Sequence, residues 1–123
     1  PLSVKSSILN LSKIHNKKNE KKYLLLGDML ELGNKSDFYH ENLSKIINNA
    51  NIDKLFVYGE KIFKTYKNIS EKKRGNILHY KEDFDEVFSS VIKNDDFLMI
   101  KGSNATGLNK ISKKIIKGIN NAL

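Results

Sequence analysis

Two short segments carry the side chains best suited to chemistry, and each follows an apolar run. After residues 24–26 the chain reads Gly27-Asp28-Met29-Leu30-Glu31-Leu32-Gly33. After residues 97–100 it reads Lys101-Gly102-Ser103-Asn104. Carboxylates accept hydrogen bonds from an amine, whereas a lysine, a hydroxyl, an amide and free backbone N–H groups can bind a carboxylate or phosphate. The two segments together predict a binding site for a small, amino-acid-like molecule.

The first segment also has a structural interpretation. Asp28 and Glu31 could orient a ligand amine or could stabilise the N-terminus of the following helix, and the sequence does not decide which of the two faces a ligand. Three glycines near strand ends, Gly27, Gly33 and Gly59, are expected to serve loop geometry through positive φ or close packing. The second segment could equally contain the N-cap of a final helix.

Catalytic and metal-binding motifs are not visible in the sequence. It lacks a GxxxxGK[ST] phosphate loop, a GxGxxG motif after the first strand and a nucleophile elbow, so no catalytic residue is assigned. His15, His40 and His79 are scattered without metal-ligand spacing, and there is no cysteine, so no metal site is predicted. His40 is interpreted as a packed or capping residue of a helix that could support the site.

The elements that must position these residues alternate along the chain. Apolar runs predict four strands, at 23–26, 55–58, 77–80 and 97–100. Helical spacing predicts helices near 1–14, 36–50, 62–66, 84–92 and 108–119, with Ser36 or Asp37 beginning the second and a charged loop at 67–76. Ile62, Phe63 and Tyr66 are placed on one face of the short helix. Alternating strands and helices predict one α/β domain, 1–123, with a parallel sheet covered on both faces.

This topology predicts where the candidate residues meet. Right-handed crossovers place the carboxyl ends of parallel strands on one rim of the sheet. Gly27, Gly59, Lys101-Gly102 and the loop after Tyr80 are therefore expected on that rim. Residues 1–20 form the first helix and the loop that follows it.

Bulk composition limits the other function classes. The net charge is +8, but Arg74 is the only arginine among 22 basic residues, and the lysines do not follow one stripe. We interpret them as solvated surface charge rather than as a nucleic-acid interface. Apolar runs are too short to span a membrane and no signal segment is visible, so a cytoplasmic protein without a membrane span is expected.

Two alternatives remain open as non-catalytic α/β binding modules. A receiver-like signalling domain would need a phosphorylatable Asp at a strand end, but the second strand ends in Tyr58-Gly59-Glu60. A basic nucleic-acid binder would need aromatic and arginine side chains interleaved on one face, whereas the aromatics are expected mostly on buried stripes.

The segments at 27–33 and 101–104, with His40 between them, resemble in order and spacing the C-terminal domain of the Mur ligases. The opening Pro1-Leu2-Ser3 resembles the tail of that family's Asn-Ala-Asn-Pro-x-Ser segment, so the resemblance covers essentially the whole chain. It implies a Rossmann-like three-layer domain that closes over a central ATPase domain and holds an incoming substrate. The substrate-binding residues it implies are Asp28, Glu31, Lys101, Gly102, Ser103 and Asn104.

The resemblance is greatest to the family member that adds D-alanyl-D-alanine to UDP-N-acetylmuramoyl-tripeptide in peptidoglycan synthesis. It implies that ATP phosphorylates the tripeptide carboxylate and that the dipeptide amine attacks the acyl phosphate, giving an amide, ADP and phosphate. ATP and Mg²⁺ are expected to bind mainly to the central ATPase domain, which acts in cis. That domain and the UDP-sugar domain lie outside this sequence, so these 123 residues alone are expected to bind no cofactor and to be inactive.

Overall fold

The computed structural model describes residues 2–29 and 35–102. Its helices are α1 (Leu2–Lys13), α2 (Ser36–Asn49), α3 (Phe63–Tyr66) and α4 (Lys81–Glu86). A 3-10 turn, η2 (Glu71–Lys73), precedes β3, and a π-helical turn, η3 (Val87–Val91), continues α4. The strands are β1 (Lys22–Gly27), β2 (Lys54–Tyr58), β3 (Arg74–Leu78) and β4 (Phe97–Lys101). The C-terminal helix expected at 108–119 lies outside the described residues.

The four described strands form one parallel sheet in the order β3-β2-β1-β4. Leu26 of β1 pairs with Val57 of β2 on one side and with Lys101 of β4 on the other. Tyr58 pairs with both Gly27 and Leu78, so the described strands end nearly level with one another. The predicted parallel sheet and its common carboxyl rim are confirmed.

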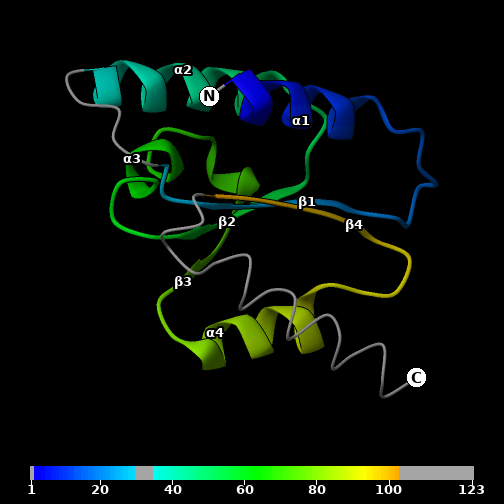
Figure 1. Cartoon of the computed structure of the whole chain (residues 1–123). Coiled ribbons are helices and arrows are strands. Elements are labelled where there is room, and N and C mark those ends of the chain that lie inside the picture. The colour runs from blue at the N-terminus through cyan, green and yellow to red at the C-terminus, as the bar shows by residue number, and fades with distance from the viewer. Residues whose placement is uncertain (1, 30–34, 103–123) are drawn as a thin grey trace.

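Helices cover both faces of this sheet, as predicted (Figure 1). Helices α1, α2 and α3 lie on one face, and α4 with η3 lies on the other. Leu24 and Leu26 face the first layer, whereas Leu25 faces the second, because successive side chains of a strand point to opposite faces. All three are fully buried, and burying each contributes about 1.5 to 3 kcal/mol to folding. This alternation explains the continuously apolar β1.

Strand β3 begins earlier than predicted, inside the segment that we expected to be a charged loop. Arg74 pairs with Leu55, and the Tyr66 hydroxyl donates a hydrogen bond to the Gly75 carbonyl at 2.7 Å. Gly75 lies so close to the Phe56 ring that an added Cβ would be 2.7 Å from it. Close packing and edge pairing therefore extend β3 back to Arg74, through residues that lack the apolar pattern expected of a strand.

The end of β3 also differs from the prediction. Tyr80 is not a strand residue but the exposed N-cap of α4, which begins at Lys81. The Asp83 carboxylate accepts backbone hydrogen bonds from His79 and Tyr80, at 2.7 and 2.9 Å, and these bonds lower its pKa. Hydrogen bonds that belong to a helix start therefore replace the strand pairing that we expected.

The starts of α2 and α3 lie close to the predicted positions. Helix α2 begins at Ser36, as predicted, and its N-cap is Lys35, which makes no side-chain capping bond. Helix α3 has only four residues, and Ile62 is its N-cap. The Phe63 and Tyr66 rings stack with centroids 5.7 Å apart and so share a face, whereas Ile62 is fully buried and Phe63 is 40% exposed.

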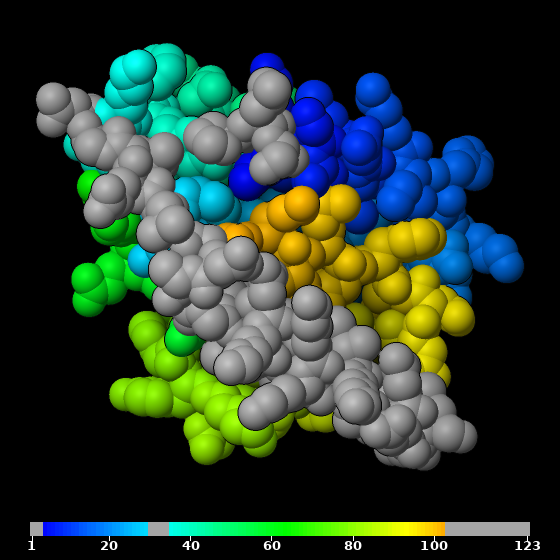
Figure 2. All heavy atoms as spheres, in the orientation of Figure 1, coloured from blue at the N-terminus to red at the C-terminus, as the bar shows by residue number. Residues whose placement is uncertain are grey.

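The two edges of the described sheet are β3 and β4. Every residue of β4 is only partly buried. Figure 2 shows β4 (orange) at the surface on one face of the molecule, between the first helix (blue) and the segment after α4 (yellow). Both edges end at the carboxyl rim, where the candidate site lies.

Candidate functional site

The carboxyl rim brings together several of the residues predicted from sequence. Asp28 directly follows β1, and Gly59 directly follows β2, its neighbour. Lys101 ends β4, on the other side of β1, and Gly102 follows it. Neighbouring strands are about 4.8 Å apart, so these positions belong to one small region. Four other predicted site residues lie outside the described residues: Glu31, Gly33, Ser103 and Asn104.

Asp28 connects two elements at this rim. Its Oδ1 accepts a hydrogen bond from the backbone N–H of Ile62 at 2.7 Å. Ile62 is the N-cap residue of α3, whose first backbone N–H groups have no partner within the helix. The Asp28 carboxylate therefore supports the start of a helix, but the helix is α3 and not the one that follows Asp28 in the sequence.

Gly59 gives Asp28 the space for this contact. Its φ is +126°, a conformation that side-chain-bearing residues rarely adopt. A Cβ at Gly59 would also lie 2.5 Å from Cγ of Asp28, well inside van der Waals contact. Gly59 is the only glycine among the described residues with positive φ, so left-handed geometry is not the reason for Gly27. The fold of the rim requires a glycine after β2.

Lys101 lies on the same face of the sheet as the Asp28–Ile62 contact. It pairs with Leu26 and follows Met99 by two residues, so its side chain points to the same face as theirs. Leu26 and Met99 both pack in the cluster beneath α1 and α2. Ile62 belongs to the same cluster. Lys101 and Gly102 are half-buried. A cation at the end of β4 and a carboxylate just after β1 thus lie on one face of the sheet, as a zwitterionic ligand would require.

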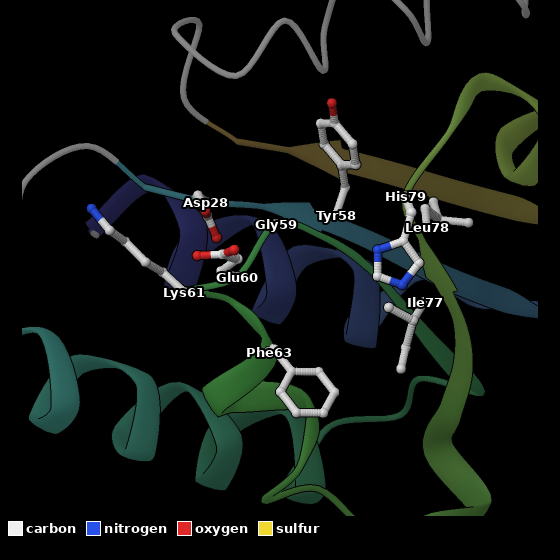
Figure 3. Close-up of a pocket in the computed structure, with 9 residues that line it drawn as sticks. All are labelled: Asp28, Tyr58, Gly59, Glu60, Lys61, Phe63, Ile77, Leu78 and His79. Carbon is white, nitrogen blue, oxygen red and sulfur yellow. The ribbon is translucent and has the colours of Figure 1, made fainter.

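A hollow of about 800 Å³ lies beside these residues at the ends of β2 and β3 (Figure 3). Among the described residues it is lined by Asp28, Tyr58, Gly59, Glu60, Lys61, Phe63, Ile77, Leu78 and His79. A volume of this size is typical of small-molecule sites. Lys101 does not line the hollow, so the described part of the rim has two portions, one beside β4 and one beside β3.

The sequence did not identify most of the hollow. Tyr58, Glu60 and Lys61 surround the glycine that was singled out, and their position after a strand was the available signal. Phe63 is expected from sequence on one face of a short helix with Ile62 and Tyr66, and nothing there marks it as a lining residue. His79 belongs to no motif, and only the sheet order brings it near β2.

His40 is a buried residue of α2 and does not line this hollow. Its Nδ1 lies 2.9 Å from the Thr65 hydroxyl, and the Ser44 hydroxyl donates to the carbonyls of His40 and Thr65. Burial lowers the pKa of His40, and Lys64 lowers it further. Its imidazole therefore links α2 to α3, the helix that Asp28 also contacts.

Two further features are absent from residues 2–29 and 35–102. No group of three or more His, Asp or Glu side chains in residues 2–29 and 35–102 could hold a metal ion. None of the helices in these ranges combines the length and apolarity needed to cross a bilayer.

Sequence comparison finds similarity to curated UDP-N-acetylmuramoyl-tripeptide–D-alanyl-D-alanine ligases. The Bacillus subtilis (strain 168) ligase is 30% identical over 100 residues, which cover 79% of this chain and 22% of the ligase. The Buchnera aphidicola (subsp. Acyrthosiphon pisum) ligase is 30% identical over 118 residues, covering 91% and 24%. The Borreliella burgdorferi ligase is 31% identical over 115 residues, covering 89% and 23%. The chain thus spans about a quarter of the length of these relatives.

Structural comparison supports the same fold. A MurF ligase from Thermotoga maritima, solved in complex with ADP, superimposes with a TM-score of 0.74 at 23% sequence identity. The match covers all of this chain and 27% of that one. No family model matches the sequence.

Proposed function

Because this chain resembles about a quarter of the UDP-N-acetylmuramoyl-tripeptide–D-alanyl-D-alanine ligases, we propose that it is the C-terminal, acceptor-binding domain of such a ligase. One observation carries this proposal: about 30% identity over 79 to 91% of the chain with ligases from three different bacteria. Residues 1–123 form a single domain in this proposal. The similarity favours a ligase over a receiver-like module or a basic nucleic-acid binder, and no nucleic-acid partner is proposed.

The two ends of the acceptor have different requirements at the rim. The carboxylate of D-alanyl-D-alanine needs a cation and N–H donors, and the proposal assigns these to Lys101, Gly102, Ser103 and Asn104. Its amine needs a hydrogen-bond acceptor, which Asp28 or Glu31 supplies. An extended dipeptide is about 7 Å long, and neighbouring strands are about 4.8 Å apart. The adjacency of β1 and β4 supports this assignment because one dipeptide can reach both strand ends.

The domain contributes to the reaction mainly by positioning. Holding the amine against an activated carboxyl group lowers the entropic barrier to amide formation, and closure of the domain excludes water from that hydrolysable group. His40 supports the site indirectly through α3. In this proposal the isolated chain has no ligase activity, and the complete ligase acts in the cytoplasm.

ATP supplies the activation of the tripeptide carboxylate. Its phosphates and Mg²⁺ are assigned mainly to the central ATPase domain, outside this chain. The relatives support this division because this chain covers only 22 to 24% of their length, which leaves most of each ligase to hold ATP.

The test uses the ligase that contains this chain, with ATP and UDP-N-acetylmuramoyl-tripeptide present. We expect ADP release to depend on D-alanyl-D-alanine and to be much weaker with L-alanyl-L-alanine, and we expect the isolated 123-residue chain to release no ADP. ADP release that is indifferent to the dipeptide, or ligase activity of the isolated chain, would contradict the proposal.

A further inference from the structure

Helix α3 lies next to α2 on one face of the sheet (Figure 1). Ile62, its N-cap residue, and Thr65 are fully buried. The Tyr66 hydroxyl donates a hydrogen bond to the Gly75 carbonyl of β3 at 2.7 Å. Contacts with the core and with β3 therefore hold α3 in place independently of α2.

Residues 28–40 run from the end of β1 into α2 and include most of the first sequence motif. The beginning of this segment is attached to α3 by Asp28. The Asp28 Oδ1 accepts a hydrogen bond from the Ile62 backbone N–H at 2.7 Å. The end of β1 is thus joined to the start of α3.

The end of the segment is attached to the same helix by His40. The Nδ1 of His40 lies 2.9 Å from the Thr65 hydroxyl, which itself donates to the His40 carbonyl at 3.3 Å. Because a hydroxyl has a single proton to donate, Nδ1 is the donor of the 2.9 Å bond. The Ser44 hydroxyl donates to the carbonyls of both residues, at 2.8 and 3.1 Å. All three side chains are buried, so water does not replace these bonds when one partner is lost.

An exposed ion pair between the same two helices contributes less. The Lys64 Nζ lies 2.6 Å from Asp37 Oδ1, but the two side chains are 45% and 84% exposed. Solvent screens such a pair, whereas a buried hydrogen bond leaves an unsatisfied group behind when it is removed. The attachment of the first half of α2 to α3 therefore depends mainly on Thr65.

These contacts join both ends of residues 28–40 to one short helix. Glu31, which the proposed function offers to the acceptor amine, lies between them in the sequence. Two ends bound to one rigid element keep a fixed separation and direction, so less freedom remains to be lost when a ligand binds. We propose that Thr65 is a positioning residue of the ligase: through His40 it holds the end of this segment, as Ile62 holds its beginning. This inference rests on the proposed function and adds a residue that no sequence motif contains.

Loss of this attachment would have a specific consequence for the reaction. The acceptor amine would less often meet the activated carboxyl group in a productive orientation. Water would then attack that group instead, which regenerates the carboxylate and releases phosphate after ADP has already formed. The ratio of ADP released to amide formed would therefore rise. A ligase that is merely less stable loses both products together and keeps the ratio unchanged.

The experiment measures this ratio and the dipeptide KM for the ligase that contains this chain. Thr65→Val removes the hydroxyl and keeps the volume, whereas Thr65→Ser keeps the hydroxyl. Val87→Ala is the stability control, because Val87 is fully buried in the layer on the other face of the sheet.

For Thr65→Val, we expect the ratio of ADP to amide to rise at least about twofold and KM for D-alanyl-D-alanine about tenfold. KM for ATP and for the UDP-linked tripeptide should stay within about twofold of the unmodified ligase. The same limit should hold for every constant of Thr65→Ser and Val87→Ala.

The outcomes separate the inference from the function on which it rests. If Thr65→Val keeps the ratio and the dipeptide KM of Val87→Ala, Thr65 only stabilises the fold and the inference fails alone. It also fails if Thr65→Ser changes as much as Thr65→Val, because the hydroxyl is then not responsible. If the unmodified ligase does not use D-alanyl-D-alanine, the proposed function fails as well.

A second variant keeps the test decisive if Thr65→Val does not fold. Ser44→Ala removes the other hydroxyl that joins the two helices, and alanine is the better helix former, so α2 itself should form. We expect the same two changes, with KM for the dipeptide raised about threefold. A folded Ser44→Ala ligase with an unchanged ratio and an unchanged dipeptide KM would overturn the inference.

Discussion

The Asp28 carboxylate accepts a hydrogen bond from the backbone N–H of Ile62 at 2.7 Å and so joins the end of β1 to the start of α3. These residues are 34 positions apart in the sequence. Through this bond, a residue of the first sequence motif shapes the hollow beside the next strand.

Replacing Asp28 should show whether its hydrogen bond to Ile62 or its negative charge stabilises the fold. Asp28→Ala removes the acceptor for Ile62 and should lower the free energy of unfolding by about 1 to 2 kcal/mol. Asp28→Asn keeps an oxygen acceptor and should cost less than Asp28→Ala. Urea unfolding of the chain measures both, with Asp85→Ala of the exposed Lys81–Asp85 pair as the control. Equal losses for Asp28→Ala and the control would contradict the structural task.

Gly59→Ala should destabilise the chain by about 2 kcal/mol or more. The residue combines a φ of +126° with a Cβ position that clashes with Asp28. In an Asp28→Ala background the clash is removed and only the backbone strain remains, so the same substitution should cost less there. A double-mutant cycle by urea unfolding measures the difference. Strictly additive losses would show that the two residues do not interact.

Thr65→Val should destabilise the fold, because it leaves Nδ1 of the buried His40 without its hydrogen-bond partner. Thr65 is fully buried, and its hydroxyl is the described partner of Nδ1 of His40. Removing the hydroxyl while keeping the volume should lower the free energy of unfolding by about 1 to 3 kcal/mol. Thr65→Ser retains the hydroxyl and serves as the matched control. A smaller loss for valine than for serine would contradict the role of this hydrogen bond.

His40 should make folding sensitive to acid. Burial lowers its pKa below the ordinary 6.5, and Lys64 and Lys61 act in the same direction, while Asp28 and Asp37 oppose them. The unfolded chain therefore binds a proton more readily than the folded chain. The contribution of neutral His40 is complete above pH 6.5 and is lost as the pH falls toward its lower folded pKa. It is not lost as the pH rises.

The measurement compares unfolding free energies of the wild type and His40→Gln between pH 8 and pH 5. The wild type should lose more stability on acidification, because the variant lacks the titrating imidazole. His15 and His79 are present in both proteins, so the comparison isolates the effect of His40. Parallel losses in the two proteins would show that His40 is not the acid-sensitive group.

The sequence predicted the sheet well where burial alone determines structure. Residues 24–26 and 55–57 are buried on both faces, and their apolar runs identified β1 and β2. It failed at Arg74 and Gly75, because their strand depends on a bond from Tyr66 and on contact with Phe56. Such tertiary contacts leave no local pattern.

The candidate site was predicted only in part for a related reason. The common rim follows from topology, and the structure confirms it. The hollow, in contrast, depends on the exposure of Phe63 and on the neighbourhood of β2 and β3. The sequence does not mark Glu60 as a residue that lines the hollow, because its place there depends on the fold around the Asp28–Ile62 hydrogen bond.

The most direct test of the account is KM for D-alanyl-D-alanine in the Lys101→Met variant of the ligase that contains this chain. Lys54→Met is the control, because Lys54 lies at the opposite end of the same sheet. The account predicts a rise of about tenfold or more for Lys101→Met, with KM for ATP and KM of the control within about twofold of wild type. A dipeptide KM that is unchanged in Lys101→Met would contradict the claim that the carboxyl rim of this domain binds the acceptor.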